Sequence, residues 1–133
     1  MLILKKDLFE KVAAHCKKEF PDEACGVFVG KDGKVERAYE MTNADKSPES
    51  FLMDPKEQLK VMKEARNLGL EIIAVYHSHV ASEAYPSAKD VELAFYPAAS
   101  YAIVTLKDKA SPRIRSFKII EGKISEEEVT ICP

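Results

Sequence analysis

The chain has 133 residues, a length typical of one domain, since domains commonly span about 100 to 200 residues. Hydrophobic residues make up 46% of it and charged residues 32%, which excludes a disordered composition and leaves ample apolar material for a core. The formal net charge of -2 gives no basic field for a nucleic-acid backbone, so we expect neither DNA nor RNA as a partner. We predict a single domain over residues 1–133.

The cysteines indicate a reducing environment. Cys16, Cys25 and Cys132 are an odd number without a C-x-x-C spacing, which argues against a disulfide framework or a four-cysteine zinc site. After Met1, only three apolar residues precede the first lysine, too few for a signal-peptide core or a membrane span. We therefore expect a cytoplasmic protein that has no membrane partner.

The first third of the chain predicts a helix and a hairpin. Apolar residues recur at steps of three and four over residues 7–20, with Asp7 as the expected cap and Pro21 as the stop. Residues 24–29 form a short apolar run, and residues 34–41 alternate imperfectly after a Lys-Asp-Gly turn.

The middle of the chain predicts a brief strand at residues 51–54 and a second helix that begins at Pro55 and ends at Gly69. The apolar face expected for this helix consists of Leu59, Met62, Ala65 and Leu68.

The last half predicts a buried strand at residues 71–76 with two histidines at its exit, a helix from Ser87 that includes Leu93, and a buried strand at residues 101–106. Residues 113–120 and 129–131 look like a closing hairpin. This order of elements is typical of an α/β domain in which helices pack around a mixed central sheet.

The H-x-H pattern of His77 and His79, followed after ten residues by Asp90, points to chemistry. Alternate residues of a strand share a face, so the two imidazoles can converge on one ion. If Ser87 is a helix N-cap, Asp90 lies in the first turn and its carboxylate can face the strand end. Two imidazoles and one carboxylate suit zinc and leave its fourth tetrahedral position open, so we predict one catalytic zinc ion per chain.

A general base must still take a proton from the water that zinc acidifies, and Glu23 is the candidate. Each of these residues also has a purely structural interpretation. A histidine pair at a strand end can simply meet solvent, and Glu23 can be a solvated loop charge. Ser87 and Asp90 also match an ordinary capping box.

Two further residues are assigned structural places. His15 lies among charged neighbours on the first predicted helix and is expected to be exposed. Cys25 is expected to be a small core residue, because no basic neighbour in sequence would lower the pKa of its thiol.

The joint pattern resembles that of the JAMM (MPN+) metallopeptidases. Their motif is a glutamate on an early strand, then H-x-H, ten residues and an aspartate, with a serine three positions before the aspartate. The matching residues are Glu23, His77, His79, Asp90 and Ser87. The resemblance spans about the first 110 residues and includes Asn43, Ser47, Pro48 and residues 21–26, 51–55 and 101–104.

The resemblance implies a cytidine-deaminase-like α/β sandwich with a mixed central sheet, the MPN/JAMM fold. It implies that His77, His79 and Asp90 bind zinc, that Glu23 is the base, and that Ser87 donates a hydrogen bond to the tetrahedral oxyanion. Residues 77–87 are similar to the prokaryotic branch that acts on sulphur carriers of the CysO-cysteine type, although Val80 stands where the wider family often has proline.

That branch implies hydrolysis of the amide after the C-terminal Gly-Gly of a ubiquitin-like or sulphur-carrier protein, which releases cysteine or a short extension. The rival hypothesis is a non-catalytic scaffold of the same fold. A nucleoside deaminase would need H-x-E and P-C-x-x-C, and a thermolysin-like peptidase would need H-E-x-x-H, and the chain contains neither pattern. The identity of the carrier stays open, as does the oligomeric state, for which a homodimer is one option.

Overall fold

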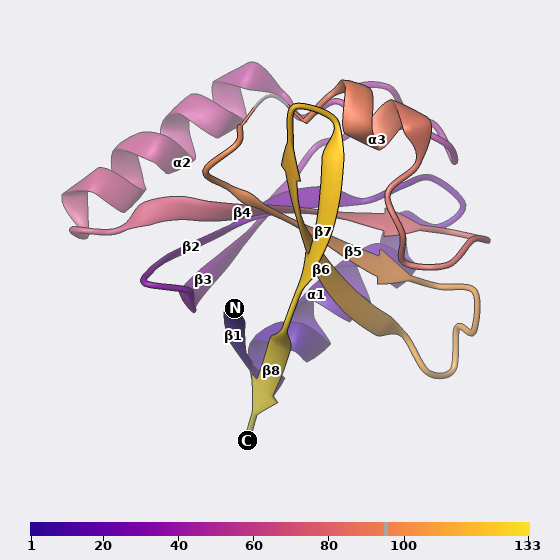
Figure 1. Ribbon diagram of the computed structural model, residues 1–133, viewed down its shortest axis with the longest axis horizontal. Coiled ribbons are helices and arrows are strands. Elements are labelled where there is room, and N and C mark those ends of the chain that lie inside the picture. Colours follow the sequence, from indigo (N-terminus) through magenta and orange to yellow (C-terminus); the bar gives the residue numbers. More distant parts are fainter. Residues whose placement is uncertain (95) are drawn as a thin grey trace.

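Eight strands form one mixed sheet in the order β7-β6-β5-β4-β2-β3-β1-β8 (Figure 1). The computed structural model describes residues 1–94 and 96–133. In chain order the elements are β1 (Leu2–Lys5), α1 (Lys6–Glu19), β2 (Cys25–Lys31), β3 (Lys34–Met41), α2 (Pro55–Asn67), β4 (Glu71–His79), α3 (Ala88–Glu92), β5 (Ser100–Thr105), β6 (Arg113–Ile120), β7 (Lys123–Glu127) and β8 (Val129–Cys132).

The centre of the sheet combines antiparallel and parallel pairing. Strands β2 and β3 form an antiparallel hairpin, and β2 also pairs antiparallel with β4. Strand β5 lies parallel to β4 on its other side, so its end lies beside the end of β4, with His79 opposite Thr105. The predicted mixed α/β fold is confirmed.

Helices cover both faces of the sheet, as Figure 1 shows with α1 behind the sheet and α2 and α3 on the other side. The side chains of α1 pack in one apolar cluster with the even-numbered residues of β4, such as Ala74 and Tyr76. Those of α2, such as Val61 and Ala65, pack in a second cluster that includes Val75 of β4. A buried strand has two apolar faces, which is why its sequence reads as a continuous hydrophobic run.

The two edge strands, β7 and β8, are consecutive in the chain, so the sheet bends until its edges approach each other. Strand β8 pairs parallel with β1, from Leu2 opposite Val129 to Lys5 opposite Cys132. The amino group of Met1 lies 3.0 Å from a carboxylate oxygen of Glu127 in β7. Figure 1 shows the two termini on the same side of the molecule, at opposite ends of the β1–β8 pair.

The predicted apolar face of α2 is wrong in part. Ala65 is buried, but Leu59, Met62 and Leu68 are half-exposed, and Val61 is buried instead. Apolar residues recur along α2 at steps of three and of four, so the sequence alone does not show which of them are buried. The position of the helix over the sheet buries Val61 and Ala65, which lie at positions i and i+4.

Several boundaries also differ from the prediction. Helix α1 begins one residue earlier and has Lys5 at its N-cap, whereas Asp7 lies in its first turn. In the region of residues 51–54 only Met53 forms a β-bridge, with Asn43. The helix from Ser87 ends at Glu92, so Leu93 is its C-cap and is 38% exposed.

The largest differences concern the chain ends. Strand β1, with only four residues, is not among the elements predicted from the sequence. The expected closing hairpin is also wrong: β6 pairs with β7, and residues 129–132 form β8 at the opposite edge of the sheet. Alternation in a short strand gives no information about which distant edge it joins.

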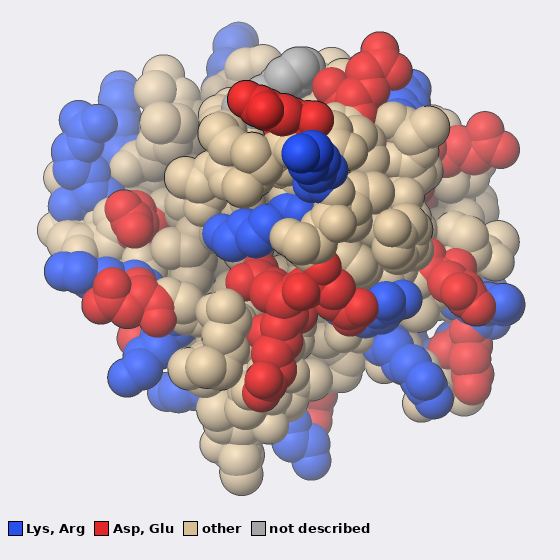
Figure 2. All heavy atoms as spheres, viewed as in Figure 1, with Lys and Arg blue, Asp and Glu red and all other residues tan. Residues whose placement is uncertain are grey.

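Charged side chains of both signs are interspersed on the surface (Figure 2), with acidic side chains over the β7–β8 region, where Glu126, Glu127 and Glu128 follow one another. Among the described residues, none of the helices has the length and apolar character needed to cross a membrane.

Candidate functional site

Two buried histidines lie at the end of the central strand β4. His77 and His79 lie within β4 rather than beyond its end, and both are 5% exposed or less. They lie on the same face as Val75, as the two-residue period of a strand requires. The Nε2 atoms of the two rings lie 3.1 Å apart.

Asp90 approaches the histidines from the first turn of α3. Its Oδ2 atom lies 3.0 Å from Nε2 of His79 and 3.2 Å from Nε2 of His77. The three atoms form a cluster that could hold a metal ion. Zinc bonds of about 2.0 to 2.2 Å in a tetrahedron place neighbouring ligand atoms about 3.3 to 3.6 Å apart, so this triangle fits zinc after a shift of a few tenths of an ångström.

A capping box holds the carboxylate in this position. The Ser87 hydroxyl accepts a hydrogen bond from the backbone N–H of Asp90, and the Ser87 backbone N–H donates to Oδ2 of Asp90 over 2.9 Å. The two sequence interpretations of this pair are therefore compatible, since the aspartate that completes the capping box also faces both histidines. Ser87 itself is solvent-exposed.

Different contacts orient the two rings. Nδ1 of His79 lies 2.8 Å from the backbone carbonyl of Glu83, so the proton belongs on Nδ1 and the lone pair of Nε2 faces the cluster. Nδ1 of His77 is buried without a hydrogen-bond partner among the described residues. The ring of Phe51 stacks on His77 instead, with 4.5 Å between centroids and 22° between planes.

The electrostatics of Asp90 and His77 favour the forms that bind metals, whereas for His79 the effect of burial is outweighed by the contacts with Asp90 and the Glu83 carbonyl, which raise its pKa. Burial by itself raises the pKa of Asp90, but its contacts with His77 and His79 outweigh that effect and hold it well below the ordinary value. Burial lowers the pKa of His77. An ionised carboxylate beside a neutral imidazole is the combination that a divalent cation requires.

Glu23 provides a second carboxylate, two residues before β2 begins. It is 4% exposed, and its Oε1 atom has no hydrogen-bond partner in the described part of the chain. The pKa of Glu23 is raised to about 8, mainly by burial, while His79 lowers it and the nearby Asp90 raises it. A buried carboxylate with a free oxygen and a pKa near neutrality has the properties of a general base.

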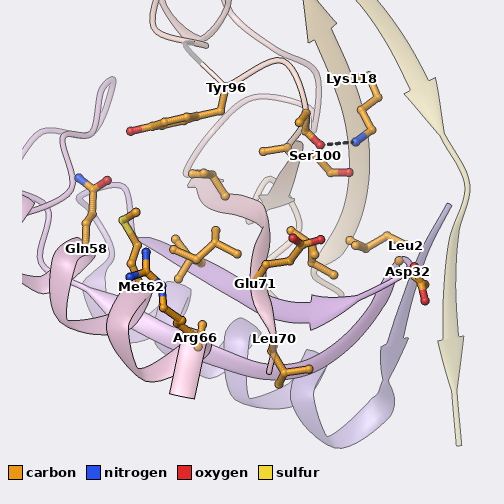
Figure 3. Close-up of a pocket in the computed structure, with 18 of the residues that line it drawn as sticks. Leu2, Asp32, Gln58, Met62, Arg66, Leu70, Glu71, Tyr96, Ser100 and Lys118 are labelled. Atoms are coloured by element: carbon orange, nitrogen blue, oxygen red, sulfur yellow. Dashed lines mark hydrogen bonds between the residues drawn. The ribbon is translucent and has the colours of Figure 1, made fainter. Parts of the chain in front are cut away.

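A small pocket of about 20 Å³ adjoins the cluster and is lined by Ser50, Phe51, His77, Pro86, Lys89, Asp90, Leu93, Tyr101, Ile103 and Ile119. A much larger groove of about 860 Å³ lies further along the same side of the sheet, beside α2 (Figure 3). Met62, Arg66 and Tyr96 line this groove, whereas Glu23, His77, His79, Ser87 and Asp90 do not. The larger of the two cavities is therefore not the one that adjoins the histidines.

The burial predicted from the sequence is right for Cys25 and wrong for His15. Cys25 is fully buried, as predicted. The prediction that His15 is exposed is wrong: the residue is 4% exposed, and its Nδ1 lies 2.7 Å from the hydroxyl of Tyr76. The charged neighbours of His15 suggested solvent, but its position one residue before Cys16 turns it toward the sheet.

Three contacts of the site were not identified from sequence. These are the Phe51 ring on His77, the Glu83 carbonyl on His79, and the hydrogen bond from the Ala24 backbone N–H to the Ser78 hydroxyl over 2.8 Å. Ser78 points to the opposite face from the histidines, and only the pairing of β2 with β4 reveals that contact.

Comparison with known proteins identifies the family. The model of a family described as prokaryotic homologues of the JAB domain matches residues 5–120. The chain is 41% identical over 133 residues to a CysO-cysteine peptidase of Mycobacterium tuberculosis, covering 98% of this chain and 91% of the relative. It is 36% identical over 109 residues to a desampylase of Pyrococcus furiosus, covering 82% and 76% of the two chains.

Solved structures agree. A solution structure of a protein from Desulfitobacterium hafniense superposes with a TM-score of 0.91 at 42% identity, covering 98% of this chain and 92% of that one. A JAB1/MPN domain protein of Archaeoglobus fulgidus shares the fold, with a TM-score of 0.63 at 20% identity over 98% and 99% of the two chains. The chain thus belongs to the prokaryotic JAB branch of the JAMM/MPN peptidases and is a JAMM-type hydrolase.

Proposed function

We propose that this protein is a zinc-dependent peptidase that hydrolyses the amide bond after the C-terminal Gly-Gly of a ubiquitin-like or sulphur-carrier protein. The observation that carries the proposal is the approach of Asp90 Oδ2 to within 3.2 Å of both histidine Nε2 atoms, close to a buried carboxylate. The relatives named CysO-cysteine peptidase and desampylase support the substrate class.

The donor set fits zinc. Imidazole nitrogens suit this borderline ion and a carboxylate oxygen is also among its usual ligands, and three protein ligands leave its fourth position free for water or substrate. His77, His79 and Asp90 would hold the ion. When bound, zinc polarises a carbonyl and makes water more acidic at neutral pH.

The remaining steps belong to residues of the chain. Glu23 accepts a proton from the attacking water at its free Oε1 atom and delivers it to the leaving amine. The Ser87 hydroxyl proton is free to turn toward the carbonyl oxygen, because the hydroxyl oxygen only accepts from the Asp90 N–H. The Glu83 carbonyl keeps the His79 ring in its orientation.

The segment around Phe51 supports recognition of an extended tail. One side of this segment pairs with residues 42–44, through Ala44 N–H to the Leu52 carbonyl and Asp54 N–H to the Thr42 carbonyl. A substrate tail can add as a strand on its other side, and glycines let the tail backbone approach closely. Replacing the penultimate glycine of the substrate with valine should then abolish turnover, and unchanged turnover would contradict this mode of recognition.

The test of the activity uses intact-mass spectrometry. Zinc-loaded protein is incubated with a sulphur-carrier protein from the same genome whose Gly-Gly end is extended by cysteine or a short peptide. We expect the carrier mass to fall to that of the Gly-Gly form with the wild type and not with Glu23→Gln. An intact carrier beside a protein that holds one zinc per chain would refute the substrate assignment and leave the metal site standing.

The full set of candidate ligands favours this activity over a non-catalytic scaffold, which has no need of them.

The three cysteines are free thiols, with Cys16 and Cys25 buried, and this supports a reducing compartment such as the cytoplasm.

A further inference from the structure

The side chain of Asn43 connects the segments that flank the candidate site. Its amide nitrogen donates to the Glu23 carbonyl and to the Ser50 carbonyl, each over 3.0 Å. Its amide oxygen accepts from the backbone N–H groups of Asp45 and Leu52, each also over 3.0 Å. An amide has two donor hydrogens and two acceptor lone pairs, so Asn43 uses its complete capacity.

The burial of Asn43 increases the free-energy cost of losing any of these hydrogen bonds. The residue is 8% exposed, and a buried polar group whose partner is removed costs more free energy than the bond itself contributes. Asn43 lies just after β3, and no helix or strand continues through it or through residues 20–24. Side-chain hydrogen bonds therefore supplement the single β-bridge between Asn43 and Met53 in holding the backbone here.

The backbone of Glu23 is the first segment that depends on this loop. Its N–H donates to the Ser47 carbonyl over 2.8 Å, and its C=O accepts from Asn43. The next residue, Ala24, bonds to Ser78 between the two histidines. The main chain that carries the Glu23 carboxylate is thus fixed on one side by the Asn43 loop and on the other by β4.

The second segment is the one that carries Phe51. Asn43 bonds to the residues on both sides of it, Ser50 and Leu52. Phe51 stacks on His77, the ring whose Nδ1 lacks a hydrogen-bond partner among the described residues. The Asn43 side chain therefore bonds to the backbone that carries the Glu23 carboxylate. Its other bonds hold the two neighbours of Phe51, whose ring stacks on His77.

We propose that Asn43 is a positioning residue of this enzyme, which sets the place of the Glu23 carboxylate relative to the histidine and aspartate cluster. This inference rests on the proposed function through the role of Glu23 as the base. A misplacement of a reacting group by about 1 Å can cost on the order of 100-fold in rate. We therefore expect the loss of the Asn43 donors to lower kcat about 10- to 100-fold while zinc content and KM change little.

The sharpest variant is Asn43→Asp, which keeps the shape and the two acceptor bonds but loses both donors. Asn67→Asp makes the same chemical change on an exposed residue at the end of α2 and is the matched control. Asn43→Ser replaces it if Asn43→Asp does not fold. The measurements are kcat and KM on the extended carrier, and zinc per chain by atomic absorption.

A double-mutant cycle separates positioning from general damage. If Asn43 acts through Glu23, adding Asn43→Asp to Glu23→Gln should change the residual rate by about twofold or less, since the carboxylate to be positioned is already absent. An equal fold-loss in both backgrounds would overturn the proposal, as would an unchanged kcat in Asn43→Asp itself.

Hydrogen exchange of the metal-free protein provides a readout that needs no activity. The amides of Glu23 and Ala24 should exchange faster in Asn43→Asp than in the wild type or in Asn67→Asp, and unchanged exchange there would overturn the proposal. If the wild type binds zinc but cleaves no Gly-Gly substrate, the proposed function fails and the exchange data still decide the structural role of Asn43.

Discussion

Glu23 is the residue in which burial and chemistry are most closely linked. Only 4% of it is exposed and its Oε1 atom lacks a partner in the described part of the chain, so folding removes water from a carboxyl group and gives little in return. A group of this kind is retained where its proton affinity matters more than its contribution to stability.

Replacing Glu23 with glutamine should leave the shape of the site intact but remove the proposed base. We expect the rate of hydrolysis to fall about 100- to 10,000-fold, the scale of general base catalysis, while the protein still binds zinc. Steady-state kinetics and metal analysis of the same preparation provide the check. Full activity in Glu23→Gln would remove this residue from the mechanism.

The raised pKa of Glu23 also predicts a pH dependence of stability in the metal-free protein. The folded group has a pKa of about 8 and its ordinary pKa is 4.5, so between these pH values the folded state holds a proton that the unfolded state has released. Stability contributed by this group is therefore complete at low pH and declines as pH rises through this window.

Urea unfolding of the metal-free protein between pH 4.5 and 8, compared with Glu23→Gln, measures this contribution. The difference in unfolding free energy should move steadily in favour of the glutamine variant as pH increases. Parallel curves for the two proteins would show that the Glu23 carboxyl group is not held protonated by burial.

Replacing His77 with alanine tests the metal cluster. The variant should bind less than one zinc per chain and lose activity, because its Nε2 atom is one corner of the three-atom cluster. His15→Ala serves as the control, since His15 is also buried but bonds to Tyr76 on the other face of the sheet. Retention of stoichiometric zinc by His77→Ala would contradict the ligand assignment.

At the scale of elements, α3 matters because its first turn delivers Asp90. The helix has only five residues and no buried residue, so packing contributes little to its position and the capping box contributes much. The geometry of the cluster thus depends on a helix that the capping serine holds in place.

Ser87→Ala should therefore weaken zinc binding as well as the helix. Loss of a cap costs about 0.5 to 2 kcal/mol, and loss of the contacts that orient a metal ligand costs about 10- to 100-fold in affinity. Ser87→Thr keeps the hydroxyl and should keep the affinity. Competition with a chromophoric chelator measures the zinc affinity of both variants, and equal affinities for alanine and wild type would count against this account.

At the scale of the molecule, the fold joins its first and last strands. Strand β1 lies between β3 and β8, and the N-terminus bonds to Glu127 at the beginning of the β7–β8 junction. The chain ends are therefore part of the sheet rather than appendages to it. Leu2 and Leu4 are almost completely buried as a result.

Removing residues 129–133 should expose β1 as an edge strand with unpaired backbone groups. We expect a lower free energy of unfolding and concentration-dependent association, measured by urea denaturation and by size-exclusion chromatography. Removal of Pro133 alone is the control, because this residue follows the end of β8. Unchanged stability and unchanged elution after the longer deletion would show that β8 adds nothing to the sheet.

Local sequence patterns are enough to predict the mixed α/β class, both long helices, the β2–β3 hairpin and the H-x-H strand. They are enough because these features depend on local periodicity, on Gly69 with a φ of 71° after α2, and on the fixed spacing of His77, His79 and Asp90. Spacing along one strand and one helix turn constrains the directions of side chains even without a structure.

The features that depend on distant pairing follow from the three-dimensional fold and not from local patterns. Strand β8 joins β1 rather than β6, His15 is buried against Tyr76, and α2 packs through Val61 rather than Leu59. The same is true of Asn43, whose four hydrogen bonds connect residues from 23 to 52. Strand partners and satisfied buried polar groups are set by which surfaces meet, and a local pattern contains no information about that.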